Sequence, residues 1–275
     1  MDGLQAIRDF VQTSTGLYFG EARMHLLRNG VTSRLISSGL NNTDEYLNLV
    51  SSEGEELDRL ISSITTQETS FMRIPGHFRV IKEVFIPSFL AQNGMIKRDY
   101  LHVWSAGCST GEEAYSLAIT LKTSGIPEGV KLSILATDID ENALNTARKG
   151  VYKKERLKHL SPAQLFTFFK KCGENSFEVK KELRDCVHFV KQNLISSPYL
   201  FDQDIVFCRN VTIYFKREIR IEVLRKIATT IRTGGYLMLG ESEILPSSIQ
   251  GFSPISYDGS IMYKKIPGGA SVKRG

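Results

Sequence analysis

The part of this sequence best suited to bind a ligand is a glycine-containing loop. An apolar run, LHVWSA, ends in Gly107-Cys108-Ser109-Thr110-Gly111, and a segment with helical periodicity begins directly after it. Glycines let the backbone turn tightly and approach a ligand closely, and a helix N-terminus offers N–H groups that lack partners within the helix. Ser109 and Glu112 have the spacing of a capping box, which predicts that these two side chains close the start of the helix.

An acidic residue completes the pattern. Asp138 follows Gly107 by 31 residues and ends the next apolar run, in ATDID. In nucleoside-binding α/β folds, an acid at this position accepts hydrogen bonds from ribose hydroxyls. The loop lacks the G-x-G-x-x-G pattern of dinucleotide-binding proteins, and Glu112 and Glu113 would repel a pyrophosphate. The loop and the acid together predict a ligand with an adenosyl or nucleotide part, against the alternative of a plain strand-to-helix turn. A ligand that carries a sulfonium and an ammonium group would tolerate the two glutamates.

The segments around the loop alternate between strand and helix patterns, which predicts a parallel sheet covered by helices on both faces. The expected strands are Tyr100–Trp104, Lys131–Ala136, Val187–Lys191, Asp204–Cys208 and Tyr236–Leu239, and the expected helices are Glu112–Lys122, Asn142–Lys149 and Arg217–Arg232. A hairpin is expected at Asp258-Gly259. Residues 151–187 interrupt the alternation, with a helix opening at Ser161-Pro162 and short antiparallel strands at Phe177–Lys180 and Arg184–Val190.

The first 70 residues have a different pattern. Apolar residues recur at a spacing of three to four, as at Leu4, Ile7, Phe10 and Val11, and strand-like runs are absent. This periodicity predicts a small helical domain. At the other end, residues 268–275 have the composition of a flexible tail.

Composition excludes several classes of protein. The formal net charge of +5 comes from basic residues that are interleaved with acids, so we expect no nucleic-acid binding and an acidic protein partner instead. The four cysteines lack metal-site spacing, which predicts free thiols and no metal. No apolar run approaches the roughly 20 residues that span a bilayer, and the N-terminus has no signal-peptide pattern. A cytoplasmic protein without membrane insertion is therefore expected.

The sequence resembles the CheR-type chemotaxis methyltransferases over nearly its whole length. The matching blocks are TTQETSFMR (65–73), VWSAGCSTGEEAYSLAI (103–119), LATDIDENALNTARKGVY (135–152), FVKQNL (189–194) and FCRNVTIYF (207–215), with a weaker match at GGYLMLGESE (234–243). These blocks occur in the family's order and at compatible spacing. The resemblance implies methyl transfer from S-adenosylmethionine to glutamate side chains of chemoreceptors in chemotaxis adaptation, with glutamyl methyl esters and S-adenosylhomocysteine as products.

The implied fold class is α/β. It comprises an N-terminal helical domain (1–70), a linker that covers the cofactor site (71–98), and a class I, Rossmann-like methyltransferase domain (99–267). A small antiparallel β-subdomain (151–187) is inserted into the methyltransferase domain. The connection between the subdomain strands, within residues 170–181, is shorter than in family members that dock on a receptor's C-terminal pentapeptide. We therefore expect no pentapeptide tethering, and we expect a monomer.

The resemblance also assigns site residues. Arg73 and Tyr214 match positions near the transferred methyl group and are the candidate catalytic residues. Glu113 and Asp138 match acids that hold the ammonium end or the ribose, and Asn193 and Leu194 match the segment beside the adenine. The full set of candidate cofactor-binding residues is Gln67, Thr69, Arg73, Gly107, Glu113, Asp138, Asn193, Leu194, Arg209 and Asn210.

Some positions depart from the family pattern, and several interpretations stay open. Gln67 stands where the family has asparagine, Ile74 where an acid is common, and Ala114 where a proline is usual. The helical domain carries five arginines, which could form either a docking face for acidic receptor helices or a solvated face. They are Arg8, Arg23, Arg28, Arg34 and Arg59. The alternatives in function are a methyltransferase for another protein or a small acid, and a cofactor- or nucleotide-sensing module without catalysis. Retention of Arg73, Asp138, Asn210 and Tyr214 argues against the last.

Overall fold

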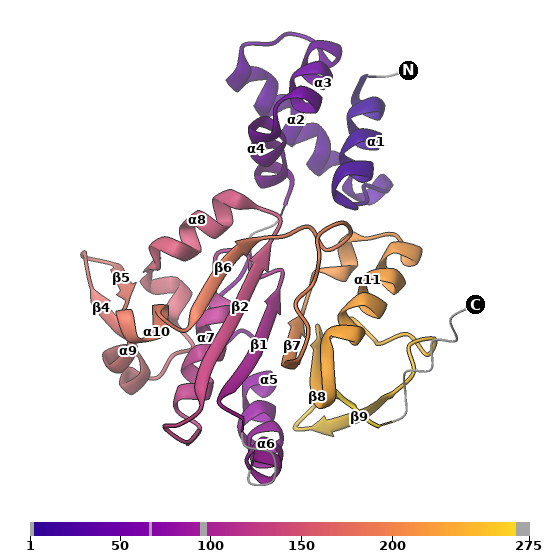
Figure 1. Ribbon diagram of the computed structural model, residues 1–275. Coiled ribbons are helices and arrows are strands. Elements are labelled where there is room, and N and C mark those ends of the chain that lie inside the picture. Colours follow the sequence, from indigo (N-terminus) through magenta and orange to yellow (C-terminus); the bar gives the residue numbers. More distant parts are fainter. Residues whose placement is uncertain (1–2, 66–67, 94–97, 268–275) are drawn as a thin grey trace.

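A computed structural model describes residues 3–65, 68–93 and 98–267 of the chain. It has a group of N-terminal helices, a large sheet with helices on both faces, and a separate small sheet (Figure 1). The N-terminal helices lie above the carboxyl ends of the central strands, while the small sheet lies beside the large one. The predicted fold class is confirmed, and the predicted tail at 268–275 lies outside the described residues.

The N-terminal part is helical, as its apolar periodicity predicts. Its elements are α1 (Gly3–Thr15), the 3-10 turn η1 (Glu21–Arg23), α2 (Met24–Ser38), α3 (Thr43–Ser52) and α4 (Gly54–Ile64). Asn42 caps α3 by accepting a hydrogen bond from the Glu45 N–H, and Gly39, at φ 70°, ends α2 in the left-handed conformation that glycine adopts without strain. The helices enclose their own apolar core, built around Ile7 and Leu60.

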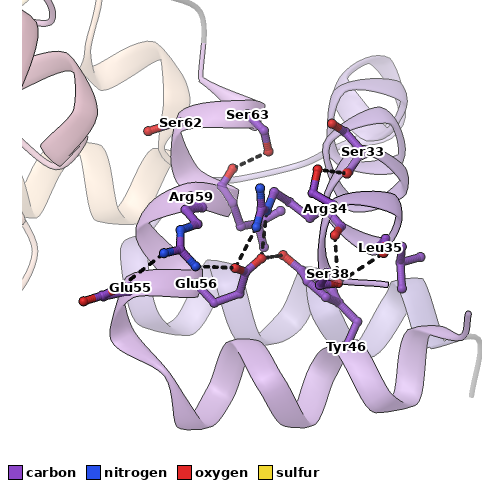
Figure 2. A network of polar contacts seen from close by, with 12 residues as sticks. Ser33, Arg34, Leu35, Ser38, Tyr46, Glu55, Glu56, Arg59, Ser62 and Ser63 are labelled. Carbon is purple, nitrogen blue, oxygen red and sulfur yellow. Dashed lines mark hydrogen bonds and ion pairs between the residues drawn. The ribbon is translucent and has the colours of Figure 1, made fainter. Parts of the chain in front are cut away.

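A buried carboxylate ties three of these helices together (Figure 2). Glu56 on α4 accepts two hydrogen bonds of 2.8 Å from Arg34 on α2 and one of 3.0 Å from the Tyr46 hydroxyl on α3. Arg59 adds a contact of 3.4 Å. Burial raises the pKa of Glu56, but the hydrogen bonds from Arg34 and Tyr46 outweigh it, so the pKa is lowered and the carboxylate stays ionised at neutral pH.

Ion pairs within the domain involve three of the five helical-domain arginines. Arg34 and Arg59 bind Glu56, and Arg8 binds its neighbour Asp9. Each of these three arginines is therefore paired with a carboxylate of the helical domain.

We expect Glu56→Ala to lower the free energy of unfolding by about 3 kcal/mol, because it leaves a mostly buried arginine and a buried tyrosine hydroxyl without their shared acceptor. Glu55→Ala is the matched control, since Glu55 also pairs with Arg59 but its side chain is 86% exposed. That control should change the free energy by less than about 0.5 kcal/mol. Urea denaturation of both variants measures the difference, and equal effects would contradict a structural role for Glu56.

The large sheet has seven strands in the order β6-β2-β1-β7-β8-β10-β9. The strands are β1 (Tyr100–Ala106), β2 (Lys131–Asp138), β6 (Val187–Lys191), β7 (Gln203–Cys208), β8 (Ile231–Leu239), β9 (Phe252–Tyr257) and β10 (Ser260–Lys265). The first five in this order pair in parallel, and the hairpin of β9 and β10 adds an antiparallel edge. The chain runs outward from β1 to β6, then returns to place β7 on the other side of β1. Such a reversal of direction is where open α/β sheets bind ligands.

Alternate side chains of the central strands face two different cores. On β1, Val103 packs into the core beneath α7, whereas Trp104 packs into the core beneath α11. Phe207 and Cys208 on β7 divide in the same way. Both faces are therefore buried, which explains why these strands read as continuous apolar runs.

Helices cover both faces of the sheet. They are α5 (Pro75–Val80), a π-helical turn η2 (Ile81–Phe85), α6 (Ile86–Asn93), α7 (Glu112–Lys122), α8 (Glu141–Lys149) and α11 (Arg217–Thr230). The Asp140 carboxylate caps α8 by accepting from two backbone N–H groups, and Gly150, at φ 64°, ends the helix.

The inserted subdomain is built differently from its prediction in one respect. It comprises β3 (Val151–Lys153), η3 (Lys154–Leu157), α9 (Pro162–Phe168), β4 (Phe169–Lys171), β5 (Ser176–Val179) and α10 (Lys181–Arg184), with strand order β3-β5-β4. The helix start predicted at Ser161-Pro162 is confirmed, with a complete capping box to Gln164. The antiparallel strand predicted at Arg184–Val190 is wrong, because α10 ends at Arg184 and Val187–Lys191 pairs in parallel with β2 in the large sheet.

Three further features bear on the expectations from composition. All four cysteines are unpaired. Within the part of the chain that the structure describes, acidic, histidine and cysteine side chains form no group of three or more that could hold a metal ion. None of the described helices is both long and apolar enough to cross a membrane.

Candidate active site

A cavity of about 290 Å³ lies at the carboxyl ends of β1, β2 and β7, where the chain reverses its direction across the sheet. Its walls come from the loops that follow these three strands, from the linker after α4, and from the end of α1. Segments far apart in the sequence therefore meet at one site, beneath the N-terminal helices (Figure 1).

The glycine loop forms one wall. Gly107 has φ 83°, and a Cβ at this position would lie 2.1 Å from a methyl carbon of Val211, so only glycine fits. Gly111, at φ 94°, is the N-cap residue directly before α7. The capping box predicted for Ser109 and Glu112 does not form, because no side chain caps α7. Glu112 instead is buried and accepts a hydrogen bond of 2.6 Å from the Thr110 hydroxyl, so it does not face the cavity.

Asp138 holds the loop and faces the cavity. One of its carboxylate oxygens accepts from the Ser109 N–H at 2.7 Å and the other from the Asp140 N–H at 3.0 Å. Burial raises the pKa of Asp138 to about 6, although these backbone hydrogen bonds act in the opposite direction. A partly buried carboxylate that retains acceptor capacity is suited to bind hydroxyl donors of a ligand.

A second acid, Glu113, is paired with a buried arginine across the cavity floor. Its carboxylate accepts from the Ser105 hydroxyl at 2.7 Å and from Arg209 at 3.2 Å. Burial raises the pKa of Glu113 and lowers that of Arg209, and the ion pair opposes both shifts. The Nε of Arg209 and the hydroxyl of Ser109 are buried without a hydrogen-bond partner among the described residues. These orphaned polar atoms on the cavity wall indicate a polar ligand.

The linker after α4 brings Arg73 to the cavity wall. Phe71 anchors this segment by edge contacts with Tyr152 and Phe169 in the core. Met72 and Ile74, on either side of Arg73, have φ values of 52° and 61°, which are strained for non-glycine residues. The exposed Arg73 guanidinium donates to the Glu68 carbonyl at 2.7 Å, and the Arg73 carbonyl accepts from Arg209 at 3.2 Å. The strained backbone therefore fixes one arginine at the cavity.

The loop after β7 is held by an acid to which the sequence analysis assigned no role. Glu243 is buried and accepts hydrogen bonds from the N–H groups of Asn210, Thr212 and Gly240 and from the Thr212 hydroxyl, at 2.6 to 3.0 Å. Asn210 itself has φ 58°. The Glu243 carboxylate thereby accepts hydrogen bonds from N–H groups of a strained turn. These hydrogen bonds set the position of Asn210 on the cavity wall.

The N-terminal helices are attached directly to this turn and to the segment after β6. The Tyr18 N–H donates to the Tyr214 carbonyl at 2.8 Å, beside a backbone bridge between Leu17 and Phe215. The Asn193 side chain donates to the Ser14 carbonyl at 2.9 Å. The helical domain therefore covers the cavity. Tyr214 lies where this domain contacts the turn after β7.

The structure brings the predicted site residues together. Every candidate in the described part of the chain lines this one cavity, namely Thr69, Arg73, Gly107, Glu113, Asp138, Asn193, Leu194, Arg209, Asn210 and Tyr214. Gln67 lies outside the described residues. The wall also includes residues that the sequence did not point to, among them Thr15, Leu17 and Asp140, and Glu243 holds the turn at Asn210. The weakly matching block GGYLMLGESE, which holds both Glu241 and Glu243, was the available signal for Glu243, and nothing local marks Thr15 or Leu17.

Comparison with known proteins gives matches over almost the whole chain. The model described as CheR methyltransferase, all-alpha domain, matches residues 2–65, and the model described as CheR methyltransferase, SAM binding domain, matches residues 67–260. A chemotaxis protein methyltransferase of Borreliella burgdorferi is 32% identical, covering 96% of this chain and 94% of that protein. Those of Vibrio parahaemolyticus and Escherichia coli are 34% and 35% identical, covering 94% and 86% of this chain and 96% and 82% of the relatives.

Proposed function

This chain belongs to the CheR methyltransferase family, and from that premise we propose that it methylates glutamate side chains of chemoreceptors. S-adenosylmethionine is the cofactor of the SAM binding domain that spans residues 67–260. The observation that supports the proposal most is the cavity itself, which is lined by two partly buried acids, Glu113 and Asp138, and by one exposed arginine, Arg73. The acids suit the cationic cofactor, and the arginine suits an anionic substrate.

The residues around the cavity fit this cofactor. Asp138 would accept from the ribose hydroxyls, because it lines the cavity and backbone N–H groups fix both of its oxygens. Glu113 and Arg209 would hold the amino-acid end, and the unpaired Nε of Arg209 would find an acceptor there. Asn193 and Leu194 would lie beside the adenine, while Thr69, Gly107 and Asn210 would complete the wall.

The chemistry needs little acid–base help from the protein. A glutamate with an ordinary pKa of about 4.3 is ionised at neutral pH, so no base is required to activate it. When bound, S-adenosylmethionine supplies a methyl group on an already activated sulfonium and yields S-adenosylhomocysteine. The protein must align the carboxylate and exclude water. Arg73 would orient the carboxylate through a bidentate contact, and Tyr214 would flank the reacting groups under the helical domain.

The raised pKa of Asp138 leads to a prediction on pH. Ribose hydroxyls donate to the ionised carboxylate, so cofactor binding should weaken as the pH falls through the pKa of about 6. If the protonated acid does not bind, the affinity falls about tenfold from pH 7 to pH 5. Calorimetric titration with S-adenosylhomocysteine across this range measures the change.

Asp138→Asn is the control for this pH dependence. It should bind more weakly at every pH and with a flatter profile, since the titrating group is gone. A profile that keeps the steepness of the unmodified protein would assign the pH dependence to another group, such as Glu113.

Methyl transfer to a purified chemoreceptor cytoplasmic fragment tests the proposed function. We expect radioactive methyl from S-adenosylmethionine to enter the fragment in a base-labile form, because carboxylate esters hydrolyse in base. The turn between β4 and β5 spans only residues 172–175, so removal of the receptor's last five residues should leave the rate unchanged. Cofactor binding without any transfer to receptor would favour another protein substrate or a module without catalysis.

A further inference from the structure

A second groove lies beside the cavity, on the outer side of the turn that carries Tyr214. It is bounded by η1 and by the start of α11, and it shares Ile213 and Phe215 with the cavity. Its lining residues are Tyr18, Gly20, Glu21, Ala22, Arg23, Ile213, Phe215, Lys216, Arg217, Glu218 and Arg220. The groove is thus continuous with the wall of the proposed active site.

Four basic side chains line this groove, against two acidic ones. Elsewhere the arginines are mostly paired with carboxylates, as Arg209 is with Glu113 and Arg232 with Asp204. In the groove, among the residues that the structure describes, no carboxylate lies within 4 Å of Arg23, Lys216, Arg217 or Arg220. Their positive charge is therefore uncompensated at close range, which suits an anionic partner.

Two of these cations also hold the Tyr214 turn. Arg23 donates to the Ile213 carbonyl at 3.1 Å and stacks 4.6 Å from the centre of the Tyr214 ring. Arg220 donates to the Thr212 carbonyl at 3.0 Å. A partner bound in the groove would thus lie one side chain away from a residue on the cavity wall.

Lys216 and Tyr18 form the outer part of the groove. The Lys216 ammonium lies 5.1 Å from the centre of the Tyr18 ring, and Tyr18 is 41% exposed. The groove therefore offers an exposed aromatic ring beside a lysine ammonium, in a lining that also holds three arginines, which suits a protein segment that carries carboxylates.

Building on the proposed function, we propose that this groove binds acidic side chains that flank the target glutamate on the substrate protein. The occupant is a carboxylate-rich segment of that protein. Continuity with the cavity places its neighbouring glutamate beside Arg73 and Tyr214, so the groove contributes to substrate affinity and not to cofactor binding.

Charge reversal in the groove tests this inference. Arg217→Glu and the double variant Lys216→Glu/Arg217→Glu alter exposed side chains, and an acid in the first turn of α11 is favourable for the helix. Arg225→Glu is the matched control, because Arg225 is an exposed arginine of the same helix that does not line the groove. The measured quantities are kcat and KM for the chemoreceptor fragment, with all its methylation positions as glutamate, and the Kd for S-adenosylhomocysteine.

We expect KM to rise roughly threefold for Arg217→Glu and about tenfold for the double variant, with less than a twofold change for Arg225→Glu. The kcat and the cofactor Kd should stay within about twofold, and the difference in KM should shrink at high salt. Equal KM values for Arg217→Glu and Arg225→Glu would overturn the inference.

A direct binding measurement separates this inference from the proposed function. Fluorescence anisotropy with a labelled hexaglutamate peptide reports on the groove without methyl transfer. Binding that is weakened by Lys216→Glu/Arg217→Glu but not by Arg225→Glu supports the groove even if the receptor fragment is not methylated, in which case the proposed substrate is wrong. Methylation of the fragment with no difference between these variants in either assay leaves the function standing and rejects the groove.

Discussion

Asp138→Ala is expected to weaken the binding of S-adenosylmethionine and S-adenosylhomocysteine at least 100-fold. Two hydrogen bonds from ribose hydroxyls to a carboxylate contribute about 1.5–3 kcal/mol each, and every 1.4 kcal/mol is a factor of ten in affinity. The substitution also removes the acceptor for the Ser109 and Asp140 N–H groups, so the glycine loop loses its attachment to the end of β2. Calorimetric titration measures the loss.

The control for Asp138→Ala must show that the fold persists. Asp185→Ala removes an exposed aspartate that follows α10 and does not line the cavity. This substitution should leave the affinity for the cofactor unchanged. Thermal unfolding without ligand should be cooperative for both variants. Undiminished cofactor binding by Asp138→Ala would mean that the ribose does not contact this carboxylate, and the site would have to be reassigned from the loop onward.

Features encoded by neighbouring residues were predictable from the sequence. The strand, glycine loop and helix at 100–122 follow one another without interruption, and each part has its own local signal. The run VWSA is buried on both faces, Gly107 must turn where Val211 leaves no room for a Cβ, and Asp138 closes the next strand. Local pattern and global fold agree here, which is why this part of the site could be predicted.

Features that depend on distant segments were not predictable. Ser109 and Glu112 have capping-box spacing, but the Ser109 N–H binds Asp138 and Glu112 turns to Thr110. Residues 184–190 have strand character in the sequence. It is the parallel pairing with β2 that places residues 187–191 in the large sheet. Local spacing offered two outcomes in each case, and a tertiary partner selected one.

The position of Glu243 shows the same limit at the site itself. The carboxylate reaches back more than 30 residues along the chain to hold the turn at Asn210 and Thr212, with Gly240 close against it. A Cβ on Gly240 would lie 2.6 Å from this carboxylate, so a larger residue would push aside an acceptor that no local pattern reveals. Asn210 was assigned from resemblance alone, and the physical reason for its strained backbone became visible only in the structure.

Strain around Arg73 leads to the second large effect. Met72 and Ile74 each hold a left-handed backbone, which costs on the order of 1–3 kcal/mol per residue and persists only where the surroundings enforce it. The Met72 N–H donates to Ser116 at 2.9 Å, and the Arg73 carbonyl accepts from Arg209. Because these anchors are main-chain contacts, removal of the Arg73 side chain leaves them in place.

We therefore expect Arg73→Ala to lower kcat for the receptor fragment by about 100-fold or more, while the cofactor Kd changes by less than about fivefold. Loss of a bidentate contact releases the target carboxylate from its alignment, and a misplacement of about 1 Å alone costs about 100-fold in rate. Arg73→Lys should restore little, since an ammonium cannot hold both oxygens in one plane. Single-turnover methyl transfer at saturating cofactor measures this step.

Arg79→Ala is the matched control for Arg73→Ala. Arg79 is another exposed arginine, six residues along the same segment, but it pairs with Asp258 and does not line the cavity. Its loss should leave kcat within about twofold. If Arg73→Ala instead weakens cofactor binding in proportion to the lost rate, Arg73 holds the cofactor and not the substrate. Alignment of the carboxylate would then fall to Tyr214 and the groove beside it, and the effect of Lys216→Glu/Arg217→Glu should appear in kcat as well as in KM.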